Sequence, residues 1–151
     1  MGTYTIPFSV TQLNSYRTSW SNDKNARQGA YGGKYPTEYV GRIQFSIGDF
    51  DTVKYKITGV KLTVNRSKIG DWGSSIYLRL YAGQVDPATL RSEVRKGTKD
   101  YTDRKLSDYS LKKFSENPST VTFTDSDVAK FNTYCIDGKS YALMMFSNEG
   151  N

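Results

Sequence analysis

The sequence predicts an all-β domain in which two sheets pack face to face, and three observations support this prediction. Apolar and polar side chains alternate along several short segments, which is the pattern of half-buried strands. These segments recur about every ten to twenty residues, and clusters of glycine, aspartate and proline separate them. Only residues 124–135 have the spacing of a convincing amphipathic helix. Many short strands with one helix are typical of a β-sandwich.

Six segments are expected to be strands. They alternate in polarity or are apolar throughout, and they comprise residues 4–10, 39–47, 57–64, 76–81, 120–123 and 141–146. Pro7 marks the first as an edge or terminal strand. The last is apolar on both faces, which indicates a central strand of a packed sheet. We expect Ile43, Leu62 and Leu78 to meet in one interior.

The outward-facing positions of two strands have their own pattern. In residues 39–47 the side chains of Arg42 and Gln44 are expected to point away from the core. In residues 76–81 we expect the side chains of Tyr77, Arg79 and Tyr81 to point away from the core and to form a second, outer face of the strand.

The expected helix over residues 124–135 has a polar start and an apolar stripe. Thr124 or Asp125 is expected to cap it, and Val128, Phe131 and Cys135 share one face. Asp86 followed by Pro87 indicates a short helical turn over residues 86–90. Residues 13–38 are expected to be irregular, and residues 95–118 to be loop with at most short strands.

The length of 151 residues suits one domain, residues 1–151. The last apolar strand is followed by a turn, and no further strand follows that turn in the sequence. This suggests an N-terminal fragment of a longer polypeptide, or a sheet that a neighbouring subunit completes. Residues 1–10 lack the pattern of a signal peptide, and no apolar run is long enough to span a membrane.

The composition argues against an enzyme. The chain has no histidine and one cysteine, Cys135, which excludes serine–histidine and cysteine–histidine nucleophiles and an internal disulfide. The acid pairs Asp49 with Asp51 and Asp125 with Asp127 complete no calcium-loop pattern. Gln28 to Tyr35 does not match a phosphate loop. The sequence therefore predicts no catalytic residue, no cofactor and no metal site.

The net charge of +6 is unevenly distributed, because residues 91–113 hold eight Lys/Arg and four Asp/Glu. One interpretation is contact with an anionic partner such as nucleic acid or teichoic acid. The other is a solvated segment, since acids alternate with bases there.

Candidate ligand contacts combine aromatic rings with hydrogen-bonding side chains. A sugar ring stacks on an aromatic face, and arginine or amide groups bind its hydroxyls. The candidates are Tyr16, Arg17, Trp20, Arg27, Tyr31, Tyr35 and Trp72. All but Trp72 lie in the glycine-punctuated residues 13–38, where a loop on a rigid scaffold would carry recognition. The alternative is that Trp20 and Tyr31 only cover one end of the core.

Three segments carry a resemblance to a known family. They read RQGAYGG over residues 27–33, YVGRIQFSI over residues 39–47 and ITGVKLTV over residues 57–64. This order resembles jelly-roll carbohydrate-binding modules of the disaggregatase-related repeat type, which occur in tail and minor structural proteins of phages of Gram-positive hosts. The resemblance covers residues 4–82 well and the rest loosely. It implies a two-sheet jelly roll without a catalytic set.

The resemblance leads to three functional expectations. The first is a non-catalytic phage tail appendage or fibre module, made in the host cytoplasm and acting outside the cell. Its partners would be a second copy, other virion proteins and a host-surface glycan. The second is a capsid decoration or head-fibre protein with a purely structural role. The third is a basic nucleic-acid-binding module.

Overall fold

The computed structural model describes residues 4–21, 24–31, 37–65, 76–111, 116 and 118–147. Its elements, in chain order, are β1 (Ser9–Tyr16), β2 (Gly29–Tyr31), β3 (Thr37–Ser46), β4 (Lys61–Val64), β5 (Ile76–Leu78), β6 (Leu80–Ala82), α1 (Pro87–Lys96), α2 (Lys99–Arg104), β7 (Tyr109–Leu111), β8 (Ser119–Thr122), α3 (Asp125–Phe131), a π-helical turn (Asn132–Ile136) and β9 (Ala142–Phe146).

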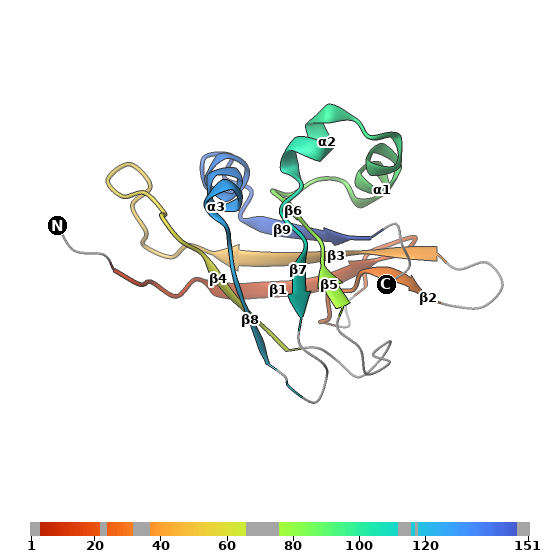
Figure 1. Ribbon diagram of the computed structural model, residues 1–151, viewed down its shortest axis with the longest axis horizontal. Coiled ribbons are helices and arrows are strands. Elements are labelled where there is room, and N and C mark those ends of the chain that lie inside the picture. The colour runs from red at the N-terminus through yellow and green to blue at the C-terminus, as the bar shows by residue number, and fades with distance from the viewer. Residues whose placement is uncertain are drawn as a thin grey trace.

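The strands form antiparallel sheets. The main sheet has the order β1-β3-β9-β6, and β2 pairs with the start of β3. β4 pairs with β8, and β5 pairs with β7, as two separate ribbons. Figure 1 shows the main sheet running along the molecule, with the two ribbons crossing its strands and the helices gathered beside β9 and β6. The predicted strand-rich fold is confirmed in part, since these antiparallel sheets are open and show no closed jelly roll.

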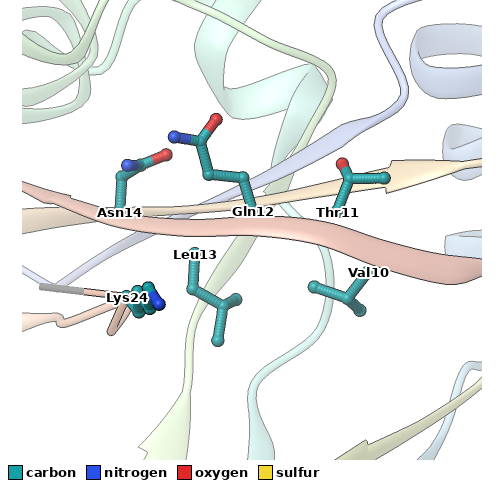
Figure 2. Close-up of a pocket in the computed structure, with 6 residues that line it drawn as sticks. All are labelled: Val10, Thr11, Gln12, Leu13, Asn14 and Lys24. Carbon is teal, nitrogen blue, oxygen red and sulfur yellow. The ribbon is translucent and has the colours of Figure 1, made fainter. Parts of the chain in front are cut away.

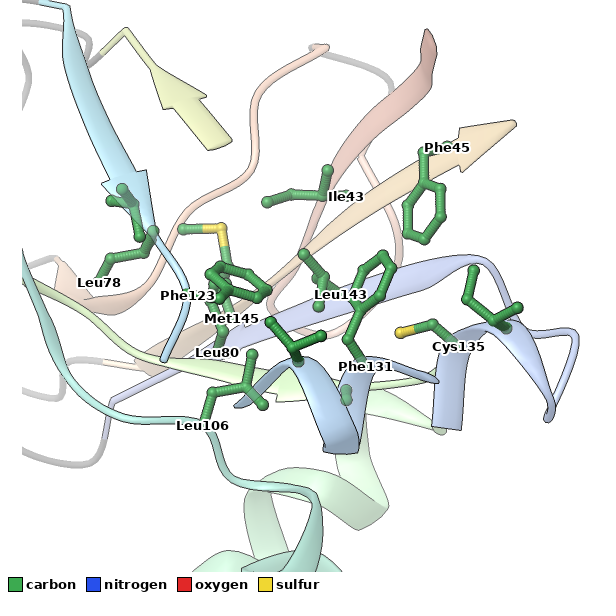
Figure 3. Packing of buried hydrophobic residues seen from close by; sticks show 14 of the residues in the cluster. Ile43, Phe45, Leu78, Leu80, Leu106, Phe123, Phe131, Cys135, Leu143 and Met145 are labelled. Atoms are coloured by element: carbon green, nitrogen blue, oxygen red, sulfur yellow. The ribbon is translucent and has the colours of Figure 1, made fainter. Parts of the chain in front are cut away.

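The principal core lies between one face of the main sheet and a second layer made of the two ribbons and α3 (Figure 3). The main sheet contributes Ile43, Phe45, Leu80, Ala82, Leu143 and Met145, and the second layer contributes Leu78, Leu111, Val121, Phe123, Val128 and Phe131. Leu62 packs against the same cluster, so the expected common interior of Ile43, Leu62 and Leu78 is confirmed. The ring of Phe131 stacks on Phe45, with their centroids 5.4 Å apart.

The opposite face of the main sheet carries a second, smaller core. Val40, Tyr81, Leu90, Met144 and Phe146 are buried in it, beneath α1 and α2. The prediction that the Tyr81 side chain lies on an outer face, away from any core, is therefore wrong. The alternation along β6 is as expected, but two helices cover this half of the face. Burial, followed by the charge of Asp108, raises the pKa of the Tyr81 hydroxyl to about 12.

The two helices on that face are the largest departure from the all-β prediction, which is wrong on this point. The expected start is confirmed, because Thr89 N donates to Asp86 Oδ2 at 3.0 Å and Pro87 opens the helix. However, α1 continues to Lys96 and ends at Gly97, whose left-handed backbone has a φ of 69°. Helix α2 also lies within residues 95–118, so the loop predicted there is wrong on this point, whereas β7 is a short strand of the kind that the prediction allowed.

Strand boundaries account for the other corrections. The first strand begins at Ser9 and ends at Tyr16, so residues 4–8 lie outside a strand and residues 13–16 are not irregular. Within residues 57–64 only Lys61–Val64 is a strand. The expected strand over residues 76–81 is two strands in different sheets, with Arg79 between them. Changing sheets at this residue lets the chain pass from one layer of the principal core to the other.

The predicted C-terminal helix is confirmed. Thr124 Oγ1 caps it by accepting a bond from Asp127 N at 3.2 Å, and Val128, Phe131 and Cys135 are all buried. Burial raises the pKa of the Cys135 thiol to about 12, and its Sγ donates to the Ala142 carbonyl at 3.1 Å. A buried thiol with a raised pKa is unreactive, so Cys135 serves in packing.

We expect Phe131→Ala to lower the free energy of unfolding by about 3–5 kcal/mol, because it removes a ring shared by Phe45 and Phe123 and leaves a cavity between the layers. Urea unfolding followed by tryptophan fluorescence measures this. The control is Val53→Ala, whose parent side chain is 96% exposed, and it should change stability by less than about 0.5 kcal/mol. A loss below about 1 kcal/mol for Phe131→Ala would contradict the core assignment.

Candidate functional site

The chain doubles back at the end of β1 and brings two aromatic rings together. Tyr16 is the last residue of β1, and Trp20 pairs with it through an isolated bridge. Their rings meet edge to face, with centroids 5.5 Å apart. Ser21 N donates to the Ser15 carbonyl at 2.8 Å and closes this reversal. Both rings are partly buried against the second core, which fixes their orientation.

Arg42 of β3 lies directly on Trp20. Its guanidinium carbon is 3.9 Å from the ring centroid, which is a close cation–π contact. Nε and Nη2 of Arg42 donate to Asn14 Oδ1 at 3.3 and 2.9 Å. Asn14 is itself buried, and its Nδ2 donates to the Ser21 carbonyl at 3.2 Å. Burial lowers the pKa of Arg42 from its usual value, although the group stays charged at neutral pH.

A second group of arginines surrounds Tyr39 at the same end of the sheet. The guanidinium carbons of Arg17 and Arg27 lie 6.0 and 5.5 Å from the centroid of the Tyr39 ring. Arg91 of α1 donates from Nη1 to the Arg17 carbonyl at 3.0 Å. Gly41 allows the backbone of Arg27 to cross beneath β3, because a Cβ at this position would lie 2.8 Å from the Arg27 carbonyl oxygen.

The open half of the second face carries a row of polar side chains beside Trp20. The register places Asn14 opposite Arg42 and Gln12 opposite Gln44, and Gln44 Nε2 donates to Gln84 Oε1 at 3.3 Å. We call these five residues (Gln12, Asn14, Arg42, Gln44 and Gln84) the polar row. Gln12 and Gln84 are exposed, and Figure 2 shows Gln12 and Asn14 on the same side of β1. The row ends where α1 and α2 begin to cover the sheet.

The structure brings together four of the seven predicted contact residues: Tyr16, Arg17, Trp20 and Arg27. They come from the end of β1 and the chain after it, and not from one free loop as expected. Tyr31 is the last residue of β2, where its backbone pairs with Thr37. Tyr35 and Trp72 lie outside the described residues.

Sequence reasoning missed the polar row, Tyr39 and Arg91 as possible contacts. The available signal was the alternation in residues 39–47, which correctly turned Arg42 and Gln44 away from the core. The prediction for these two side chains went no further than their outward direction. Their partners on β1 could not be found, because no strand was expected over residues 11–16.

Several of the described acids are engaged by the protein itself. Asp51 Oδ1 accepts bonds from Val53 N and Lys54 N, and Asp127 accepts bonds from Ser107 N and the Tyr109 hydroxyl. Among the residues that the structure describes, no three Asp, Glu or Cys side chains gather in a way that could hold a metal ion. In the same part of the chain, no helix has the length and apolar character to cross a membrane.

The basic segment partly neutralises its own charge. Lys96 lies 3.4 Å from Glu93, Lys99 lies 3.6 Å from Asp103, and Lys105 lies 2.6 Å from Asp108. These pairs sit on α1, α2 and the chain that follows, so the charges are spread around two short helices. This arrangement favours the solvated interpretation of residues 91–113 over a contact with an anionic polymer.

An open pocket of about 500 Å³ follows the outer edge of β1. Val10, Leu13 and Lys24 line it on one side of the strand, and Thr11, Gln12 and Asn14 line it on the other (Figure 2). Among the described residues no strand pairs with this edge over residues 9–13. The pocket is therefore the exposed rim of the main sheet and not an enclosed cavity.

Comparison with known proteins gives no relative: no family model matches the chain, and no curated protein or solved structure is significantly similar to it.

We expect Asn14→Ala to lower the free energy of unfolding by about 1–3 kcal/mol, because it leaves the partly buried Arg42 and the Ser21 carbonyl without their partner. Urea titration measures the loss. Gln12→Ala, two residues earlier on the same face, should stay within about 0.5 kcal/mol of the unmutated protein. If both variants were equally stable, Asn14 would not hold the reversal.

Proposed function

We propose that the protein is a non-catalytic binding module that holds a carbohydrate across the polar row, with Trp20 and Arg42 at one end. The observation that carries the proposal is the arrangement itself. Amide and guanidinium groups from two paired strands lie close together beside an aromatic ring. Such groups donate to and accept from hydroxyls, and the sheet holds them in place before any ligand arrives.

The flatness of this face favours an extended ligand. Most of the polar row stands on two paired strands, so its side chains follow a surface and not a cleft. A polysaccharide presents hydroxyls along its length and can use several shallow contacts at once. A small metabolite would need to be enclosed to bind well, and this face does not enclose one.

The resemblance in the sequence supplies a setting for this proposal. We propose a jelly-roll module of a phage tail appendage or fibre, made in the host cytoplasm, that contacts host-surface glycan outside the cell. Two packed layers of antiparallel strands support that architecture. A nucleic-acid-binding role is less favoured, because three lysines of the basic segment are paired with neighbouring acids.

The binding face can be tested on a glycan array that includes polysaccharides of Gram-positive cell walls. We expect the unmutated protein to bind a subset of glycans, and the double variant Gln12→Ala/Gln44→Ala to lose affinity at least about tenfold, since each lost hydrogen bond costs about 0.5–1.5 kcal/mol. Apparent affinities on the array and calorimetry with the best ligand measure this.

The matched control is Thr63→Ala/Asn65→Ala, which truncates two exposed polar side chains at β4, on the other layer. It should bind as the unmutated protein does. Equal losses in both double variants would contradict the assigned face. An array with no bound glycan would contradict carbohydrate binding altogether.

A purely structural virion role is the second candidate, and the outer edge of β1 favours it. β1 (Ser9–Tyr16) contains no charged residue, although the chain carries a net charge of +6. Two copies could therefore pair antiparallel along residues 9–13 without placing like charges opposite each other. The occupant of this edge would be a second copy of the chain.

We expect the protein to form a concentration-dependent dimer in sedimentation velocity, and Val10→Lys to return it to monomer. The substitution places two lysines near the dimer axis. Val53→Lys, at a position that is 96% exposed and distant in sequence, adds the same charge and should leave the dimer unchanged. A protein that stays monomeric at all concentrations would contradict edge pairing.

A further inference from the structure

Arg42 is a partly buried cation whose protein contacts are neutral. It donates to the Asn14 amide oxygen and stacks on Trp20. No carboxylate in the described ranges forms an ion pair with it. Nη1 makes no hydrogen bond to any described residue.

Arg79 shows what a comparable arginine looks like when the fold uses it internally. Its side chain is 13% exposed, Nε lies 3.5 Å from Asp108 Oδ2, and Nη1 donates to Ser147 Oγ at 2.6 Å. Among the residues that the structure describes, Arg79 thus has an acid partner and Arg42 has none. Partial desolvation of a cation is unfavourable unless an opposite charge compensates it.

The surroundings of Arg42 also fix its direction. Trp20 covers one face of the guanidinium, and Asn14 occupies the edge formed by Nε and Nη2. What remains for a ligand is the Nη1 end, and the strand register puts Gln44 and Gln12 next along the same two strands. A planar carboxylate or a phosphate is the group that a guanidinium binds best from this side.

We propose that the glycan bound by this face is acidic, and that a carboxylate or phosphate on it pairs with Arg42 while the neighbouring hydroxyls lie on the polar row. This inference rests on the proposed function and specifies its ligand class. Carboxylate and phosphate are both anions whose oxygens accept hydrogen bonds from a guanidinium, so the experiment must distinguish them. Arg42 acts here as a specificity-determining contact.

The test uses a glycan array with neutral, carboxylate-bearing and phosphate-bearing saccharides. We expect the bound glycans to be acidic, and Arg42→Met to weaken their binding at least about tenfold, as for a charged hydrogen bond. Arg95→Met removes the same charge from an exposed position of α1 and should change affinity less than about twofold.

A measurement on the unmutated protein guards against misfolding of the Arg42 variant. The best glycan is bound before and after its acid group is removed, by carboxyl reduction for uronic acids or by dephosphorylation for phosphate esters. We expect a loss of at least about tenfold for whichever treatment removes the group that is present. This comparison also identifies the group as carboxylate or phosphate.

The failures of the two proposals are distinguishable. If neutral glycans bind as tightly as acidic ones, or if neutralising the glycan leaves its affinity unchanged, the acidic ligand is wrong and the carbohydrate face stands. If no glycan on the array binds the unmutated protein, both proposals are wrong.

Discussion

The double-sided burial of β9 is the constraint on which the described structure depends. This strand lies between β3 and β6, and all five of its residues are buried. Leu143 and Met145 face the principal core, while Met144 and Phe146 face the second core. Because a strand sends alternate side chains to opposite faces, an apolar run at this place requires a cover on both sides. The ribbons with α3 supply one cover, and α1 with α2 supply the other.

The candidate site exists because the second cover is incomplete. Helices α1 and α2 lie over the half of the face that carries β9 and β6, where the side chains are apolar. On β1 and β3, Tyr16 and Val40 still belong to or pack against the second core. The rest of this face on the two strands carries amides and Arg42 instead, and Trp20 stands beside Arg42. One sheet face thus has an apolar part that the helices cover and a polar part on β1 and β3. Ligand binding at this face would depend on the change of polarity between neighbouring strands and not on a separate binding loop.

The sequence predicted the core of this structure well and its boundaries poorly. Alternation found β3, β8 and the inward side chains Ile43 and Leu78, since burial on one face is a strong pattern, and a continuous apolar run found β9. It missed α1 and α2 because their helical stripe is short, with Leu90 and Val94 as its main apolar contacts. Asp86 and Pro87 did predict the start of α1, and the signal that would have given its end was Gly97.

The site was only partly predictable for a related reason. Tyr16, Arg17, Trp20 and Arg27 were found by residue type, because aromatic and guanidinium side chains stand out in a glycine-rich stretch. Asn14 and Gln12 were not found, because their role comes from the register between β1 and β3. Pairing of strands that are distant along the chain depends on contacts that no local pattern encodes.

The close approach of the Arg27 backbone to Gly41 affects the entropy cost of binding a ligand at this end of the sheet. With the Arg27 backbone lying against β3, and Gln28 joined to Tyr77 and Arg79 by bonds of 2.6 and 3.0 Å, the segment is fastened at successive residues. The backbone of this segment is therefore already ordered in the free protein. Binding of a ligand here would cost the segment little further conformational entropy. Affinity would then reflect mainly the quality of the contacts themselves, and association would proceed without a slow rearrangement of the chain.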